Sequence, residues 1–355
     1  MFHQAGPQRT RCCNIRSEMA VSPQRGGVGF VLSHEQFPPG ELIEYAVAAE
    51  AAGFGAVWAS DHFHPWQDDQ GHAGQAWLTL AAIGQRTRRL TMGTAVTCPI
   101  YRYSLAIVAQ AFATLGLLYP GRVFLGVGTG EAVNETPAGG GWGPYPERLA
   151  RLREAITLIR RLWTGDWVTS AGPAFPLANA RIYDAPTEPV PVYVAASGPK
   201  SAALAGELGD GWITDATTLT GRPETGAAFR AAAAAAGKHP GELPVLAELY
   251  AVVGDEAEAL AVAPLWQFGP VMGDLISEPD PRGVQRRAAE LSSPERTVRS
   301  WAIGRDPAVH VRRIEELFAA GATQVYVHSA QPDQRRVIEF YGREVLPALA
   351  RPDRS

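Results

Sequence analysis

The sequence predicts a closed barrel of eight parallel strands with helices between them, a (β/α)8 fold. Eight short apolar runs alternate with longer amphipathic stretches. Such an alternation indicates βαβ units that share a parallel sheet, and eight strands are the number that closes such a barrel. The first run continues into SHEQFPPG. This segment lacks the glycine pattern that the competing fold, a doubly wound dinucleotide-binding sheet, carries after its first strand.

Each predicted strand is short, rich in β-branched or aromatic residues, and bounded by glycine, proline or polar residues. This pattern is typical of strands that are buried on both faces. In chain order, the predicted strands cover residues 28–32, 56–60, 90–96, 122–128, 192–197, 211–215, 246–254 and 323–329.

Helical periodicity marks several of the intervals between the strands. Residues 41–53 place Leu42, Ala46, Ala49 and Ala52 along one face and end at Gly53, a residue suited to closing a helix. Residues 147–165 and 307–321 repeat this pattern, and the alanine run 231–236 also predicts a helix. The longer, irregular segments 139–144 and 255–287 are expected to be insertions over one face of the barrel.

Composition narrows the class of protein. The chain has 355 residues, a formal net charge of −4 and 46% hydrophobic residues, so it can bury a large core. The near-neutral charge argues against nucleic acid or a membrane surface as a partner. No run of eighteen apolar residues occurs, so no membrane span is expected.

The cysteines and residues 1–26 indicate in which cellular compartment the protein is expected. Cys12, Cys13 and Cys98 fit neither a disulfide framework nor the spacing of a metal site, which favours a reducing, cytoplasmic location. Residues 1–26 lack the apolar core of a signal peptide and are expected to be a disordered leader, with Met19 as an alternative start. Residues 27–350 then form a single barrel domain.

Chemically versatile residues gather at one end of the predicted strands. Catalytic groups of such barrels lie where strands end and loops begin, whereas the opposite ends here look like plain turns. The residues at these positions are Ser33, His34 and Glu35; Asp61, His62, His64 and Trp66; Thr97, Cys98 and Pro99; Gly128, Thr129, Gly130, Glu131 and Asn134; Ser197, Gly198 and Pro199; and Thr214 and Asp215. Their placement on one side predicts an active site.

Each candidate also has a structural interpretation. Asp61 is also suited to capping a helix, and His62 to a buried histidine that is satisfied by a backbone carbonyl. Trp66 is also typical of a hydrophobic core, and Cys98 is typical of a small buried residue that fills space in the core. The run GVGTGE and the SGPK turn suit either simple strand-to-helix turns or helix N-termini that bind an anion. Only their occurrence together at successive strand ends favours catalysis.

Five stretches resemble the coenzyme F420 (deazaflavin)-dependent dehydrogenases of the luciferase-like barrel superfamily. They are SHEQF, SDHFHPW, GTAVTCPIYRY, AQAFATLGLLYPGRVFLGVGTGEAVNE and VAASGPKSAALAGELGDGW. The likeness runs from about residue 27 to about residue 349. The branch that it indicates contains actinobacterial glucose-6-phosphate and hydroxymycolic acid dehydrogenases, and SHEQF and VTCPIYRY look more like the second group.

The resemblance implies a role for each candidate. His62 would take the proton of a substrate hydroxyl while hydride passes to C5 of the deazaflavin, and Glu131 would exchange a proton with the cofactor ring. Trp66 would flank the reacting centre, Glu35 would bind substrate or water, and Asp61 would hold the cofactor or orient His62. No metal is implied. The other implied cofactor contacts are Ala95 and Val96, whose bond matches a place where the family often has a cis peptide, Cys98, Gly128, Thr129, Gly130, Asn134, Ala195, Ala196, Ser197 and Gly198.

The chain departs from the sugar-phosphate relatives at the phosphate clamp. The corresponding positions fall near Asp215, Thr218, the loop GPVMGDLISEP and Ser300, and none of them is cationic. A carboxylate at such a position repels a dianion. We therefore expect Asp215, Thr218 and Ser300 to contact a non-phosphorylated substrate, such as a polyol, an amino sugar or another secondary alcohol.

Four functions remain open at this stage. The first is F420-dependent oxidation of a secondary alcohol, and the second is a redox-neutral epimerisation in which hydride returns to the opposite face. The third is reduction by reduced F420, and the fourth is a non-catalytic flavin-binding barrel. The set Asp61, His62, Trp66 and Glu131 argues against the last, because a binding protein needs no base. A homodimer is expected from the resemblance.

Overall fold

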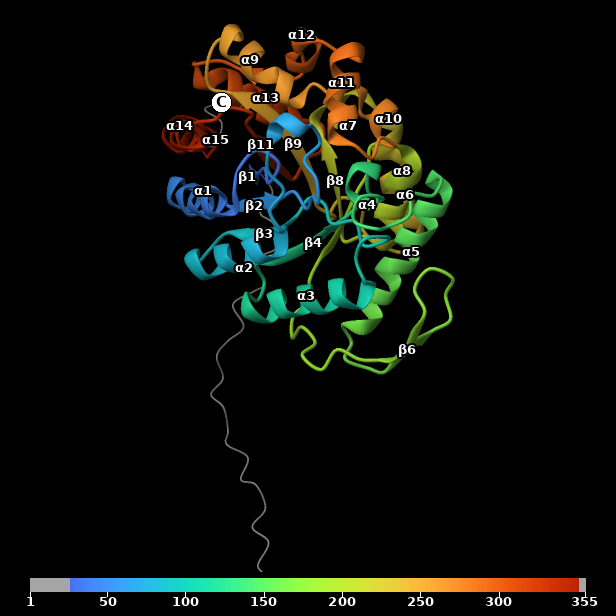
Figure 1. The fold of residues 1–355 in the computed structure, drawn as a ribbon. Coiled ribbons are helices and arrows are strands. Elements are labelled where there is room, and N and C mark those ends of the chain that lie inside the picture. The colour runs from blue at the N-terminus through green and yellow to red at the C-terminus, as the bar shows by residue number, and fades with distance from the viewer. Residues whose placement is uncertain (1–25, 351–355) are drawn as a thin grey trace, which may run out of the picture.

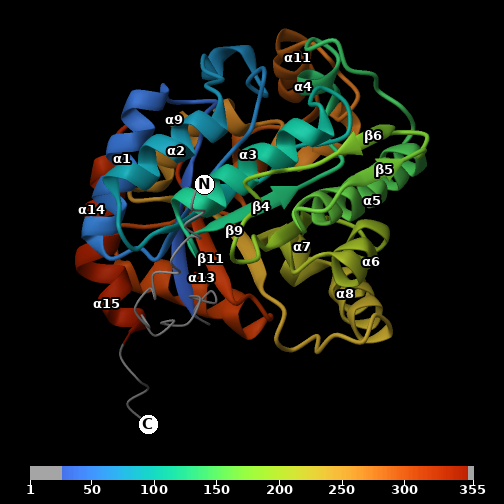
Figure 2. The same ribbon diagram turned by 90° about the horizontal axis from the view of Figure 1, so that it is seen from below.

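The computed structural model describes residues 26–350, and these form the predicted eight-stranded parallel barrel (Figures 1 and 2). The last barrel strand pairs in parallel with the first, which closes the ring. The predicted leader lies outside the described residues apart from Gly26. In order around the barrel, the strands are β1 (Gly27–Leu32), β2 (Ala56–Ala59), β3 (Thr91–Thr94), β4 (Val123–Val127), β7 (Val192–Ala195), β8 (Gly211–Asp215), β9 (Val245–Val252) and β11 (Gln324–His328).

Aromatic side chains fill the interior of the barrel. Trp58 and Tyr326 stack with ring centroids 3.9 Å apart, and Phe124 lies 5.2 Å from Tyr193. Gly29 leaves room for this layer, because a Cβ atom there would lie 2.5 Å from the Tyr326 ring. Alternate residues of a strand point to the same side. On five strands the next inward-facing residue toward the carboxyl end is polar, so a polar layer lies above the aromatic side chains: Ser33, Ser60, Asp215, Glu248 and His328.

Helices surround the barrel where the periodicity predicted them. The predicted helix 41–53 is observed, and Gly53 adopts a left-handed conformation (φ 99°) that closes it. The surrounding helices are α1 (Pro39–Ala52), α2 (Ala76–Arg86), α3 (Leu105–Leu118), α5 (Tyr145–Leu162), α6 (Pro199–Leu208), α8 (Pro223–Ala235), α13 (Pro307–Ala319) and α14 (Gln334–Phe340). None of the described helices is long and apolar enough to cross a membrane.

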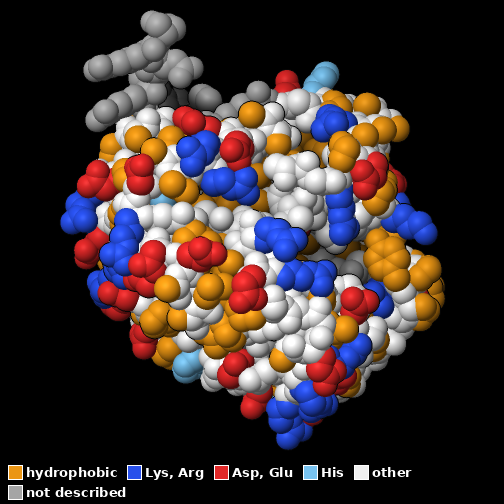
Figure 3. Space-filling model, turned by 90° about the horizontal axis from the view of Figure 1, so that it is seen from above, with side chains coloured by type: hydrophobic (Ala, Val, Ile, Leu, Met, Phe, Trp, Pro, Cys, Tyr) orange, Lys and Arg blue, Asp and Glu red, His pale blue; other side chains and the backbone are white. Residues whose placement is uncertain are grey.

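The insertion between β9 and β11 is larger and more regular than predicted. It is mostly helical, because Asp255, Asp280 and Ser293 each cap a short helix with their side chains. Its elements are α9 (Glu256–Val262), η2 (Ala263–Trp266), η3 (Gly269–Val271), α10 (Met272–Leu275), α11 (Pro281–Leu291), α12 (Pro294–Val298) and β10 (Ala302–Ile303). Acidic, basic and apolar side chains are interspersed on the face above α9, α11 and α12 (Figure 3).

The other departures from prediction are small elements. A hairpin of β5 (Val168–Ser170) and β6 (Leu177–Ala180) precedes β7, in a stretch whose sequence suggested no strand. Two short helices, α4 (Ala132–Glu135) and α7 (Ala216–Gly221), follow β4 and β8 directly. The remaining elements are η1 (Asp68–Gln70), η4 (Tyr341–Val345) and α15 (Leu346–Leu349).

Candidate active site

A histidine and a glutamate from neighbouring strands face each other at the carboxyl end of the barrel. His62 follows β2 and Glu35 follows β1, and Nε2 of His62 lies 3.4 Å from Oε1 of Glu35. The other ring nitrogen, Nδ1, lies 3.0 Å from the carbonyl oxygen of His64 and 3.1 Å from Nδ2 of Asn134. The ring is therefore held along one edge and presents Nε2 to Glu35. Both side chains are buried.

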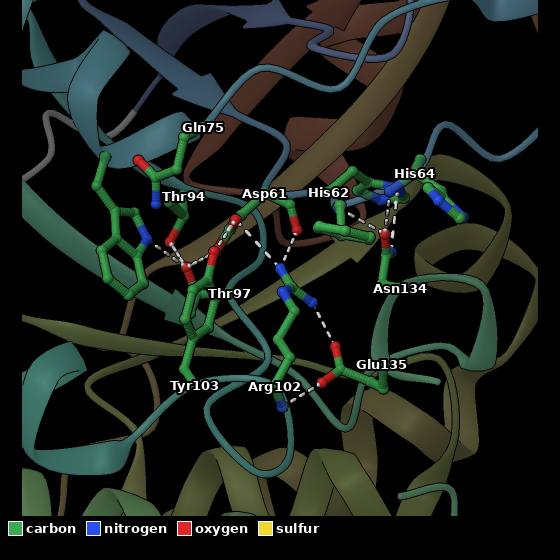
Figure 4. A network of polar contacts seen from close by, with 12 residues as sticks. Asp61, His62, His64, Gln75, Thr94, Thr97, Arg102, Tyr103, Asn134 and Glu135 are labelled. Atoms are coloured by element: carbon green, nitrogen blue, oxygen red, sulfur yellow. Dashed lines mark hydrogen bonds and ion pairs between the residues drawn. The ribbon is translucent and has the colours of Figure 1, made fainter. Parts of the chain in front are cut away.

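Asn134, on the short helix α4 that follows β4, fixes the loop that carries His62 (Figure 4). Its Oδ1 accepts hydrogen bonds from the backbone N–H groups of Phe63 (2.9 Å) and His64 (3.2 Å). Its Nδ2 donates to Oε2 of Glu131 over 3.3 Å. The side chain is fully buried. Asn134 thus joins the loop of the base candidate His62 to Glu131, and its predicted contact with the cofactor stays a prediction.

Glu35 is held as a carboxylate by two serines. Ser33 and Ser60 donate their hydroxyl protons to Oε2 over 2.9 and 2.5 Å. Burial alone would raise the pKa of Glu35, but His62 and the Ser60 hydroxyl favour the charged form and leave that pKa below its ordinary value. Sequence reasoning gave Ser60 no role, since a single serine at a strand end has no distinguishing pattern.

Replacing Glu35 by glutamine should change how stability depends on pH. Because its folded-state pKa is lowered, the carboxylate stabilises the fold above the unfolded pKa of about 4.3, and this stabilisation is lost as the pH falls through the folded pKa. The difference in free energy of unfolding between wild type and Glu35→Gln should therefore shrink between about pH 6 and pH 3. Urea unfolding measures it. Glu44→Gln, which alters an exposed ion pair, is the control, and a difference independent of pH would contradict the prediction.

Asp61 takes part in a buried ion network rather than in a contact with His62. Its carboxylate accepts hydrogen bonds from Thr97 (2.7 Å) and Tyr103 (2.9 Å) and lies 3.1 Å from Nη2 of Arg102. Arg102 also binds the carboxylate of Glu135 on α4 (Figure 4). Among the described residues Asp61 shares no hydrogen bond with His62, and Arg102 donates to the backbone carbonyl oxygen of Asp61. That Asp61 holds the cofactor or orients His62 stays a prediction.

The charged groups in this network shift the pKa values of their neighbours. Burial favours the neutral form of Arg102, but Asp61 and Glu135 outweigh it, so the pKa of the guanidinium is raised. Burial and the charge of Asp61 raise the pKa of Tyr103 to about 12. Arg102 was not among the predicted site residues, although it lies in the PIYRY stretch that resembles the family.

Trp66 lies beside His62, and its predicted place beside the reacting centre stays a prediction. The two rings lie 5.3 Å apart, and Trp66 stacks on Phe268 of the insertion with centroids 4.6 Å apart. Trp66 belongs to a second buried cluster that consists largely of insertion residues. The insertion therefore supplies an aromatic wall beside the base candidate.

Some of the candidate cofactor residues after β3, β4 and β7 are partly exposed, whereas others are buried and support the loops. Ala95, Val96 and Ala195 are partly exposed and lie on the aromatic interior layer of the barrel, and the Ala95–Val96 peptide bond is cis, as the resemblance implies. Cys98, in contrast, is buried, and burial raises the pKa of its thiol. A Cβ on Gly130 (φ 72°) would lie 2.4 Å from the Cys98 sulfur. This favours the filler interpretation for Cys98.

The glycines after β4 let two loops approach closely. A Cβ on Gly128 would lie 2.7 Å from Cγ2 of Val96. Thr129 is half-buried beside it, and Ala196 is buried after β7. These placements are consistent with the predicted cofactor-facing loops, in which Gly128 brings Val96 against the end of β4.

The N-terminus of α6 is open. Gly198 is its N-cap, no side chain bonds its first amides, and a Cβ on Gly198 would meet nothing within 4 Å. Ser197 and Lys200 are exposed beside it, and Arg222 donates to the carbonyl oxygen of Ser197 over 3.0 Å. Free helix amides together with two cations suit an anionic group.

Of the three predicted substrate residues, Asp215 and Thr218 contact each other, and Ser300 shares no hydrogen bond with them among the described residues. Asp215 caps α7: it accepts hydrogen bonds from the backbone N–H of Thr218 (2.9 Å) and from its hydroxyl (2.6 Å). Ser300 is exposed after α12, its carbonyl oxygen accepts a hydrogen bond from Arg313, and within residues 26–350 it shares no hydrogen bond with the other two. In the same part of the chain, no group of three or more His, Cys, Asp or Glu side chains is arranged to hold a metal ion.

Ionisable side chains at the carboxyl ends of the strands are typical of the active sites of barrel enzymes, and comparison with known proteins confirms the predicted class, an oxidoreductase. The model of the luciferase-like monooxygenase family matches residues 20–324, and the chain belongs to that family. These findings confirm the fold and the family branch that the sequence predicted.

Three similar proteins are each named as F420-dependent. The chain is 48% identical to the F420-dependent hydroxymycolic acid dehydrogenase of Mycobacterium tuberculosis, over 95% of this chain and 92% of that relative. It is 41% identical to an F420-dependent glucose-6-phosphate dehydrogenase of Nakamurella multipartita, over 90% and 96%. Among solved structures, an F420-dependent secondary alcohol dehydrogenase in complex with an F420-acetone adduct superimposes with a TM-score of 0.86 at 36% identity, over 92% and 99%.

Proposed function

We propose that this protein is an F420-dependent dehydrogenase that oxidises a non-phosphorylated secondary alcohol, with His62 as the base. The observation that carries the proposal is the buried His62–Glu35 pair beside Trp66 and Glu131. The named activities of the similar proteins support the cofactor and the type of reaction. A homodimer and a cytoplasmic location remain predictions.

The residues at the site can each perform part of an alcohol oxidation. His62 accepts the hydroxyl proton at Nε2, and the negative charge of Glu35, 3.4 Å away, stabilises the imidazolium that results. Nδ1 carries the proton in this tautomer and donates it to the carbonyl oxygen of His64, while Asn134 holds the loop through the backbone N–H groups of Phe63 and His64. Trp66 and Phe268 exclude water from this side, which favours hydride transfer.

The structure offers surfaces that fit a deazaflavin. When bound, F420 supplies the acceptor for the hydride that leaves the alcohol carbon. Ala95, Val96 and Ala195 are small, partly exposed apolar residues against which a planar ring can lie. The open N-terminus of α6, with Lys200 and Arg222, suits the anionic tail. Glu131 lies within reach of the same loops and is available to exchange a proton with the ring.

Several cations that a substrate phosphate could recruit are already bound to other groups of the protein, which favours a substrate without a phosphate. Lys238 donates to the carbonyl oxygens of Gly206 and Gly209 at the far end of α6. On α11, Arg282 pairs with Asp280 (2.8 Å) and Arg287 pairs with Glu278 (3.7 Å). The predicted clamp positions carry Asp215 and Thr218, which bond to each other. A neutral or amine-bearing polyol suits such a site better than a dianion.

Absorbance of the deazaflavin tests the function directly. Purified protein is mixed with oxidised F420 and a panel of secondary alcohols, polyols and amino sugars, with glucose 6-phosphate as the comparison. We expect bleaching with a non-phosphorylated alcohol and little with glucose 6-phosphate. Conversion of substrate without net bleaching would instead support the epimerase alternative. Failure to bind F420 at all would overturn the proposal.

A further inference from the structure

Four ionisable side chains form a row along one side of the polar layer. They are Glu248 on β9, His328 on β11, Glu35 after β1 and His62 after β2. The four strands are consecutive neighbours in the barrel. Carboxylate and imidazole alternate along this row, so each histidine has a carboxylate beside it. The proposed function uses only His62 and Glu35.

His328 and Glu248 have the geometry of a histidine–carboxylate pair. Nδ1 of His328 lies 2.7 Å from Oε1 of Glu248. The ring is stacked on Tyr250, with centroids 4.4 Å apart, and meets Trp266 of η2 edge-on at the same distance. The His328 side chain is 3% exposed, whereas that of Glu248 is 26% exposed. The ring is thus fixed in orientation, and its carboxylate partner reaches the open part of the site.

The other nitrogen of His328 is the unusual feature. Nε2 is buried and has no hydrogen-bond partner among the described residues. Buried polar atoms normally have one, and a bridging water or a proton-transfer role commonly explains an exception. Because Nδ1–H donates to Glu248, the neutral ring has a free lone pair at Nε2. The protonated form of His328 would lie close enough to Glu35 to lower the pKa of that carboxylate, so the two side chains lie in the same electrostatic neighbourhood.

We propose that His328 and Glu248 form a second proton-accepting pair, which takes the substrate proton from the His62–Glu35 pair. The inference rests on the proposed function. The alcohol loses a hydride to oxidised deazaflavin and its hydroxyl proton to His62. The proton passes from Nε2 of His62 to Glu35 and, through one bridging water, to Nε2 of His328.

Glu248 stabilises the imidazolium of His328, as the carboxylate of a catalytic triad stabilises its histidine. The bridging water then carries the proton from Nε2 toward solvent, so the ring returns to its starting tautomer. The other ionisable groups around His328 are Tyr250 on β9 and Asp215 on β8, which pairs in register with Glu248. His328 therefore acts on the substrate only through Glu35, because it takes the proton onward and restores the Glu35 carboxylate for the next turnover.

Two substitutions test the pair. His328→Phe keeps the ring stacking on Tyr250 and removes both nitrogens, and Glu248→Gln keeps an acceptor for Nδ1–H and removes the charge. In single-turnover experiments, we expect the rate of deazaflavin reduction to change less than about threefold. Steady-state turnover should fall about tenfold or more, the low end of the effect of a lost acid–base group. In a third variant, His328→Ala, added imidazole should restore turnover, because it can occupy the volume of the missing ring. His239→Gln, in the exposed loop before β9, should leave both rates unchanged.

Some outcomes would overturn the proposal. Steady-state rates within twofold of wild type would show that the pair moves no proton. An equal loss in both rates without rescue by imidazole would show a purely structural role. Nitrogen-15 spectra of the protein without cofactor give an independent readout. His328 should carry its proton on Nδ1, and its ring signals should respond to Glu35→Gln. An Nε2–H tautomer or unresponsive signals would refute the pair even if wild type reduced F420, whereas a wild type inactive with every alcohol would refute only the proposed function.

Discussion

Replacing His62 by alanine is expected to lower kcat/KM for the alcohol by about 10²- to 10⁴-fold, the usual contribution of a positioned base. The imidazole is the group that faces Glu35, and Asn134 and the His64 carbonyl hold it there. The affinity for F420 should stay within about tenfold, the scale of one lost contact of about 1.4 kcal/mol. Steady-state kinetics and a fluorescence titration of the cofactor measure the two quantities separately.

His64→Ala is the matched control for this experiment. His64 lies in the same loop and supports His62 only through its backbone carbonyl oxygen, which the substitution preserves. Its side chain should therefore matter much less, with a loss in kcat/KM below about tenfold. If His62→Ala no longer bound F420, the histidine would be a cofactor ligand and the assignment as base would be wrong.

The parts of the fold that the sequence predicted are those with a strong local signal. All eight barrel strands lie where an apolar run was bounded by glycine, proline or polar residues, because burial on both faces requires such a run. The insertion was less predictable, since its helices of four to eleven residues are too short for a clear period. Their positions depend on caps and on packing against Trp66 and Trp266.

The site shows the same division between local and long-range information. His62, Glu35, Trp66 and Glu131 follow strand ends directly, and the structure brings them together. The partners that hold them lie far away in the sequence: Arg102 is 41 residues from Asp61, and Glu248 and His328 are 80 residues apart. Pairing of this kind depends on the order and register of strands. One signal was present, since Glu248 and His328 are ionisable residues inside otherwise apolar strands.

Arg102→Met is expected to cause the largest loss of stability among single substitutions at the site, about 3–5 kcal/mol. The methionine fills similar volume without charge, so the carboxylates of Asp61 and Glu135 remain buried with no cation between them. Arg102 also donates to the backbone carbonyl oxygen of Asp61, and its own amide donates to Glu135. Its loss should therefore loosen the loop that carries His62. Urea unfolding followed by circular dichroism measures the effect.

Two further variants separate the buried network from the general loss of an arginine. Arg153→Met removes an ion pair with Glu207 in which both side chains are more than 40% exposed, and such pairs contribute only about 0–1 kcal/mol. The triple variant Arg102→Met, Asp61→Asn, Glu135→Gln removes the uncompensated charges as well. It should recover part of the stability that Arg102→Met loses, because neutral amides are less costly to bury than unpaired carboxylates. If Arg102→Met lost no more stability than Arg153→Met, the buried carboxylates would have to be neutral, and Arg102 would not be what holds the β2 loop against α4.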